Sequence, residues 1–129
     1  MSLRTIRKAR LLSPLFIALA LAVPIAVAVA TEPVQLSPRH ATLLRCSAAF
    51  ALVAQRQAAG DPAALVWPAM AERGQEYFVR AGAEIMGGAG LGRERLGELI
   101  RAEATALAAP DALGAAMPDC LASLDASGL

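Results

Sequence analysis

The chain has few of the residues from which metal sites and catalytic centres are usually built. Its 129 residues include only two cysteines, one histidine, one tryptophan and one tyrosine. A zinc site needs several Cys or His ligands at short, regular spacings, and the patterns CxxC, HxxxH and ExxH do not occur. A histidine general base needs a nucleophile or an orienting partner, and nothing in the sequence marks one for His40. We therefore expect no metal, no cofactor and no catalytic residues.

Lysine is missing after Lys8. Four of the 12 basic residues lie in the first ten positions, which leaves eight Arg against 11 Asp and Glu and a formal charge of −3 for the remainder. A mildly acidic domain offers no basic patch for the phosphates of nucleic acid. It also offers no polybasic segment for anionic lipid. Nucleic acid is therefore not an expected partner.

Strand patterns are also missing. After residue 30 no stretch of four to eight residues alternates apolar and polar positions with β-branched side chains. The composition is 57% hydrophobic but only 4% aromatic, because much of it is alanine, a strong helix former. We predict an all-α fold, a small bundle of four or five helices in one domain over residues 31–129.

The first thirty residues have the pattern of a secretory signal peptide. Basic residues in positions 1–10 are followed by an uncharged stretch, Leu11 to Ala30, that ends in Ala28-Val29-Ala30. This small-x-small ending predicts cleavage between Ala30 and Thr31 and a periplasmic or secreted location. Twenty uncharged residues are also close to the length that spans a bilayer. An uncleaved N-terminal helix that anchors the protein in a membrane is therefore the alternative.

The first predicted helix covers residues 38–59. Ser37 and Pro38 form a cap-plus-proline start, and Gly60 fits the left-handed residue that ends a helix. Its inner face is predicted from helical spacing. That face consists of Leu43, Cys46, Phe50 and Val53.

Further helices are expected downstream. Asp61-Pro62 begins a one-turn helix over 63–67, and a second long helix is predicted over 68–86. Within the second helix, Gly74 and Gly82 indicate either close helix–helix approach or a weak helix. The glycine-rich run 87–92 predicts a break. After it we expect a helix over 92–108, and then two short helices, 112–116 and 119–125, separated by Met117-Pro118.

Two other patterns favour ordinary structural roles. The glycine-rich run contains no Gly-Lys-Ser/Thr and follows a predicted helix instead of a strand, so it does not indicate a phosphate-binding loop. The carboxylate pairs Glu72/Glu76 and Glu94/Glu98 are interleaved with arginines, which is typical of a solvated helix face. An enzyme is therefore not the favoured interpretation.

Cys46 and Cys120 are predicted to form a disulfide, as expected for an exported domain. The bond would close a loop of about 75 residues, which the chain-entropy model values at roughly 4 kcal/mol. Two buried thiols or an intermolecular bridge are the alternatives. A redox-active pair is less favoured, because the Asp119 carboxylate beside Cys120 disfavours a thiolate.

Three segments together resemble small exported two-cysteine helical proteins of alphaproteobacteria. The segments are 45–50 (Arg-Cys-Ser-Ala-Ala-Phe), 72–79 (Glu-Arg-Gly-Gln-Glu-Tyr-Phe-Val) and 117–121 (Met-Pro-Asp-Cys-Leu). In that family one cysteine lies in the first helix and one near the C-terminus. The resemblance supports export and a structural disulfide and implies no activity.

We therefore expect a non-enzymatic binding or interaction protein. Trp67, Tyr77 and Phe78 are the predicted apolar contact surface, with Trp67 as a lid over a helix junction. The expected partner is a protein or an envelope component, and a chaperone-like role is one version of this hypothesis. The alternative is a carrier that holds a small apolar ligand in a cavity between helices.

Overall fold

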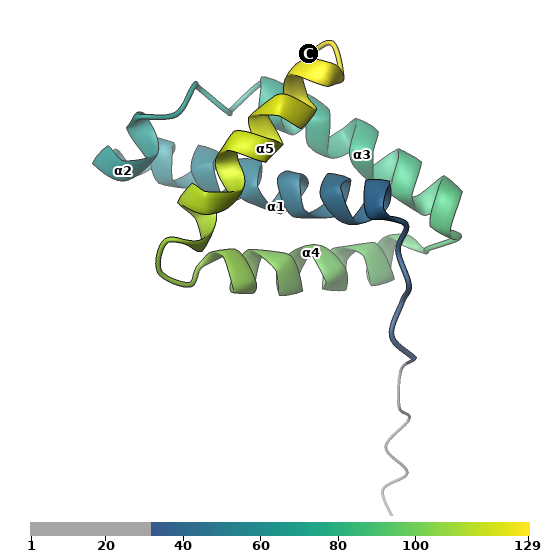
Figure 1. The fold of residues 1–129 in the computed structure, drawn as a ribbon. Helices are drawn as coiled ribbons and strands as arrows, with labels where there is room; N and C mark the ends of the chain where they lie inside the picture. Colours follow the sequence, from purple (N-terminus) through teal and green to yellow (C-terminus); the bar gives the residue numbers. More distant parts are fainter. Residues whose placement is uncertain (1–31) are drawn as a thin grey trace, which may run out of the picture. The chain divides into compact units, whose positions relative to one another are not determined.

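The computed structural model describes residues 32–129, so the predicted signal segment and its cleavage site between Ala30 and Thr31 lie outside the described residues. Within them the chain forms five helices and no strand (Figure 1), which confirms the all-α prediction. The helices are α1 (Pro38–Ala58), α2 (Pro62–Leu65), α3 (Arg73–Ala89), α4 (Arg93–Leu107) and α5 (Ala112–Ala126).

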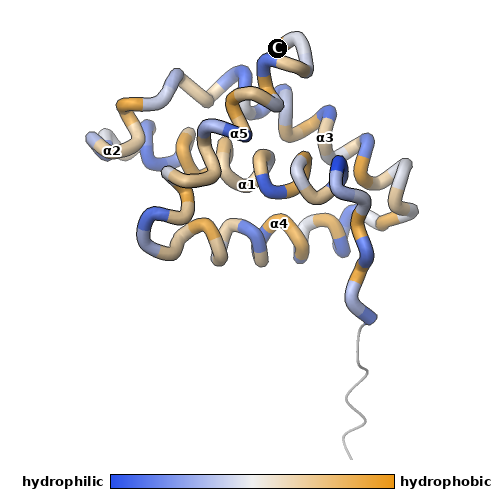
Figure 2. Tube along the Cα trace, in the orientation of Figure 1, coloured by the Kyte–Doolittle hydropathy of each residue, from blue (hydrophilic) through white to orange (hydrophobic). Residues whose placement is uncertain are grey.

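Helix α1 is the centre of the bundle. It packs against each of the other four helices, and Figure 1 shows it between α3 and α4 with α5 crossing it. The predicted inner face is confirmed, because Leu43, Cys46, Phe50 and Val53 are all buried. Ala48 and Ala49 are buried as well, and their small side chains leave room for neighbours on both sides. Figure 2 shows hydrophilic residues recurring between hydrophobic ones along α3 and α4, as expected for helices with one solvated face.

The predicted boundaries at the two ends of α1 are confirmed. The Ser37 hydroxyl accepts a hydrogen bond from the His40 amide at 3.1 Å, and Pro38 occupies the first turn. Gly60 has φ +74°, a left-handed conformation that favours glycine. Asp61 then caps α2 by accepting from the Ala63 amide at 2.9 Å.

The prediction that the second long helix begins at residue 68 is wrong, because α3 begins at Arg73. The reason lies in the side chain of Gln57, on α1, which holds the segment between α2 and α3 in an irregular path. Its Nε2 donates toward carbonyl oxygens at 3.0–3.1 Å, and its Oε1 accepts an amide at 3.0 Å. The carbonyls belong to Ala64, Trp67 and Pro68, and the amide belongs to Met70.

The predicted break over residues 87–92 begins later than expected. Helix α3 continues through Gly87 and Gly88 to Ala89 and ends at Gly90, whose φ of +65° is left-handed. The Leu91 amide then donates to the Met86 carbonyl at 3.2 Å, which closes the end of the helix.

The predicted break at Met117-Pro118 is wrong, because α5 is one helix with Pro118 inside it. An interior proline removes a hydrogen bond and costs about 3 kcal/mol. Pro118 lies on the exposed side of the helix, so the carbonyl that it leaves unpaired can bond to water. The opposite side buries Met117, Cys120 and Leu124, and this packing offsets the cost.

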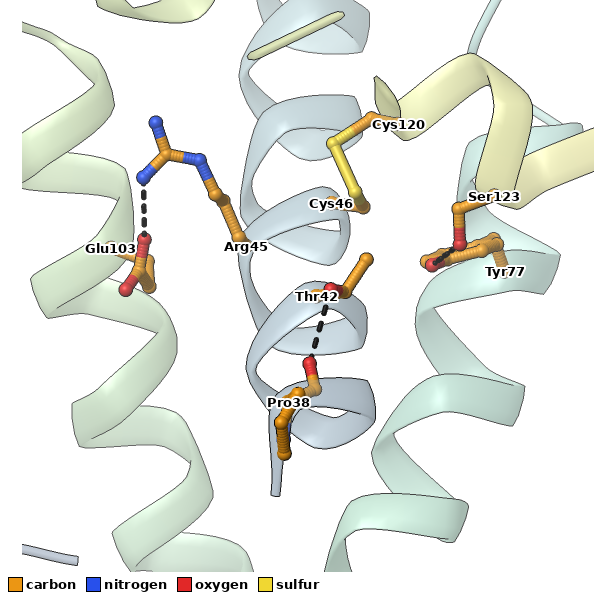
Figure 3. Close-up of a disulfide and its surroundings, with 8 residues drawn as sticks. All are labelled: Pro38, Thr42, Arg45, Cys46, Tyr77, Glu103, Cys120 and Ser123. Carbon is orange, nitrogen blue, oxygen red and sulfur yellow. Dashed lines mark hydrogen bonds and ion pairs between the residues drawn. A yellow bond between two sulfur atoms is a disulfide. The ribbon is translucent and has the colours of Figure 1, made fainter. Parts of the chain in front are cut away.

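The predicted disulfide is confirmed, with Cys46 and Cys120 bonded and each only 1% exposed. It joins the middle of α1 to α5 (Figure 3). Two further contacts in Figure 3 tie α1 and α5 to their neighbours: Arg45 lies 3.8 Å from Glu103 on α4, and Ser123 bonds the Tyr77 hydroxyl at 2.7 Å. The disulfide and the Ser123–Tyr77 bond thus hold α5 against α1 and α3.

Candidate functional site

The structure does not bring the predicted contact residues Trp67, Tyr77 and Phe78 together on one surface. Tyr77 is only 2% exposed, and its ring packs edge-on against Phe50 with 5.0 Å between ring centroids. Burial raises the pKa of its hydroxyl, which is bonded to Ser123. Tyr77 is thus a core residue, and its inclusion in the contact surface was wrong. Successive residues in a helix point about 100° apart. Because Tyr77 faces the core, Phe78 lies at the edge of the core, where it is partly buried.

Phe78 lines an apolar groove between α1 and α3, which we call the α1–α3 groove. Its volume is about 420 Å³. The floor is made of buried residues, among them Phe50 and Met70, and the rim includes Val79, a residue that is 59% exposed. The full lining is Phe50, Ala51, Ala54, Met70, Ala71, Gly74, Gln75, Phe78 and Val79.

Gly74 determines how closely the two walls of the groove approach. A Cβ atom at this position would lie 3.1 Å from the Phe50 Cβ and 3.3 Å from the Met70 Cβ. Both distances are shorter than ordinary van der Waals contact between carbon atoms. Only glycine therefore lets α3 pack this closely on α1, which confirms the prediction of close helix approach at this residue.

The α1–α3 groove contains no charged side chain. The charged residues of α3 lie elsewhere on the helix and pair with one another or with neighbouring elements. Arg80 bonds Glu76 at 2.7 Å, and Arg73 lies 3.2 Å from Asp125. Arg39 of α1 makes two bonds to Glu84, one of them 3.0 Å long, and these bonds hold the pKa of the Glu84 carboxyl below its usual value. The groove is thus a neutral surface beside a charged one.

Trp67 lies at a different place. It lines a cavity of about 300 Å³ between the α2 region and the turn from α4 to α5. A third cavity, of about 320 Å³, lies beside Tyr77 and includes Arg39, Arg80 and Glu84. Because Glu76 and Glu84 already pair with the two arginines of this cavity, it presents no free charge to a ligand.

The other side chains considered for chemistry have structural roles. The His40 ring packs over Gly88, where a Cβ atom would lie 2.5 Å from the ring Cε1. Glu98 pairs with Arg95 at 2.6 Å. Among residues 32–129 no group of three or more His, Cys, Asp and Glu side chains could hold a metal ion. In the same part of the chain, no helix has both the length and the apolar character needed to cross a bilayer.

Sequence reasoning missed Gln57 and most of the lining of the α1–α3 groove, of which it named only Phe78. A signal for the groove was present, since Ala71, Gln75, Phe78 and Val79 recur at helical spacing without a charge. Gln57 gave no signal, because its four partners are made by an irregular backbone that the local sequence does not specify. Comparison of the chain with protein-family models, curated proteins and solved structures finds no significant match.

Proposed function

We propose that this is an exported, non-enzymatic binding protein whose α1–α3 groove takes an uncharged, apolar segment of a partner protein. The observation that carries the proposal is the neutral groove itself, in which Val79 is 59% exposed above a floor of buried side chains. Exposed apolar surface that is grouped over a hollow is typical of interaction sites. The lack of charge selects a partner segment without charge, because a buried unpaired ion is costly.

The expected binding is weak and transient. Burying the exposed part of one Val side chain is worth on the order of 1 kcal/mol, and a groove of this size accepts only one or two partner side chains. Such contacts fall well below the area of stable protein complexes. This fits a chaperone-like protein of the periplasm that holds apolar segments briefly, and it does not fit a permanent subunit.

The disulfide supports the exported part of the proposal. Cys46 and Cys120 are bonded and sealed in the core, and such bonds persist in oxidising compartments outside the cytoplasm. The same bond supports a non-enzymatic role, since neither sulfur is available as a nucleophile. His40, the other candidate for chemistry, is occupied in packing against α3.

The groove can be tested with a fluorescein-labelled peptide of uncharged, apolar sequence, whose anisotropy rises on binding. Val79→Asp puts a charge in the groove and should weaken binding at least tenfold. Leu65→Asp is the matched control, because Leu65 is also 59% exposed but does not line the groove, and it should bind like the wild type. Equal binding by all three proteins would refute the groove as the site.

The export step needs a separate measurement, the intact mass of protein made in an exporting host, with and without reduction before alkylation. A mass that begins at Thr31 and gains alkyl groups only after reduction would agree with the proposal. A full-length mass would indicate the anchored alternative, and alkylation without reduction would contradict a closed disulfide in the exported protein.

A further inference from the structure

The cavity beside Trp67 combines two opposite charges with an aromatic wall, which the α1–α3 groove lacks. It is formed by the end of α1, the α2 region and the turn from α4 to α5. Its volume of about 300 Å³ is at the small end of ligand sites, which suits a small metabolite and not a peptide. The residues that carry the argument are Arg56, Trp67 and Asp111.

Arg56 and Asp111 are charges without counterparts. Within residues 32–129 neither side chain has an ion-pair or hydrogen-bond partner, and the two do not pair with each other. Arg56 is partly buried and Asp111 is exposed. A ligand that carries both an anion and a cation could pair with the two residues at once.

The apolar residues of the lining would contact the uncharged part of such a ligand. Trp67 is partly buried and lines the cavity together with the apolar residues Val66 and Leu113. The lining thus offers an apolar surface between one basic and one acidic residue.

We propose that this cavity binds a free amino acid with an apolar side chain. The carboxylate pairs with Arg56, the ammonium group pairs with Asp111, and the side chain packs on Trp67. Charge-assisted hydrogen bonds at both ends exceed what either end alone supplies. The proposal is independent of the α1–α3 groove, because the two sites share no residue.

Tryptophan fluorescence tests the proposal directly, because Trp67 is the only tryptophan in the chain. The probes are L-leucine, 4-methylpentanoate, which lacks the ammonium group, and 3-methylbutylamine, which lacks the carboxylate. We expect a saturable change in emission with leucine, at a Kd at least tenfold lower than for either analogue. No saturable change with leucine, or equal affinity for 4-methylpentanoate, would overturn the proposal.

Three variants place the ligand in the cavity. Arg56→Gln and Asp111→Asn should each raise the Kd for leucine at least tenfold, and asparagine is chosen because it tolerates the left-handed φ of +62° found at this position. Arg101→Gln is the control: Arg101 is exposed on α4 and lies outside the cavity, so its loss should leave the Kd unchanged. Circular dichroism confirms that each variant is folded. Leucine binding that survives both cavity substitutions would overturn the assignment.

Discussion

Replacing Gly74 with alanine tests the close contact between α1 and α3. The new Cβ atom would lie 3.1 Å from the Phe50 Cβ and 3.3 Å from the Met70 Cβ. Both neighbours are attached directly to the backbone, so neither can move away without shifting a helix or the segment that leads into one. Alanine at this position should therefore force α3 away from α1.

The magnitude follows from two opposing terms. Replacing glycine with alanine inside a helix stabilises it by about 1 kcal/mol. Overpacking a tight core costs roughly 1–3 kcal/mol, so Gly74→Ala should lower the free energy of unfolding by about 1 kcal/mol. Gly87 lies in the same helix with nothing within 4 Å of an added Cβ, so Gly87→Ala should raise that free energy by about 1 kcal/mol.

The assay is urea unfolding followed by circular dichroism, with thermal melts as a second measure. The two variants should differ by about 2 kcal/mol, which corresponds to roughly 10 °C in Tm for a domain of this size. Gly82→Ala is an intermediate case between these two variants. Its added Cβ would lie 3.5 Å from a Leu96 methyl, which is an ordinary van der Waals contact. If Gly74→Ala is as stable as Gly87→Ala, the account of the α1–α3 contact is refuted.

Three other variants test a buried hydroxyl, the disulfide and an ion pair on the surface. Ser47→Ala removes a buried hydroxyl that has no hydrogen-bond partner among the described residues. The substitution should therefore raise the free energy of unfolding in urea by about 1 kcal/mol. A loss of stability would mean that the hydroxyl is bonded. Replacing Cys46 and Cys120 with alanine should cost roughly 4 kcal/mol, and a cost below about 1 kcal/mol would contradict a structural role for the bond. The Glu84 carboxyl has a pKa below its usual value because Arg39 bonds it, so its contribution is present above pH 4.5 and is lost as the pH falls through the lowered pKa. Glu84→Gln should therefore flatten the decline of stability in acid, and an unchanged pH profile would exclude this pair as a contributor.

The sequence predicted the parts of the fold that local chemistry determines. Ser37 and Asp61 are capping residues wherever a helix follows them, and Gly60 ends a helix because it alone adopts a left-handed φ without strain. The spacing of Leu43, Cys46, Phe50 and Val53 places them on one face regardless of what covers it. These features need no knowledge of distant residues.

The features that sequence reasoning got wrong depend on contacts across the fold. Pro118 stays inside α5 because Met117 and Cys120 are held against α1, and a local rule for helix breakers cannot include that packing. Tyr77 is buried against Phe50, and its hydroxyl is hydrogen-bonded to Ser123, 46 residues away. The close approach at Gly74 was predicted, but Phe50, the partner that it meets on α1, was not.

The most direct test of the proposed function is an amide chemical-shift titration of the ¹⁵N-labelled domain with the uncharged apolar peptide. The account predicts that the perturbed amides cluster in two segments, 50–54 on α1 and 70–79 on the approach to α3 and its first turns, which supply the lining of the groove. Amides of the surface-exposed side of α4 should not move. Perturbations centred on α4 or α5, or none at saturating peptide, would contradict the claim that this groove is where the protein binds its partners.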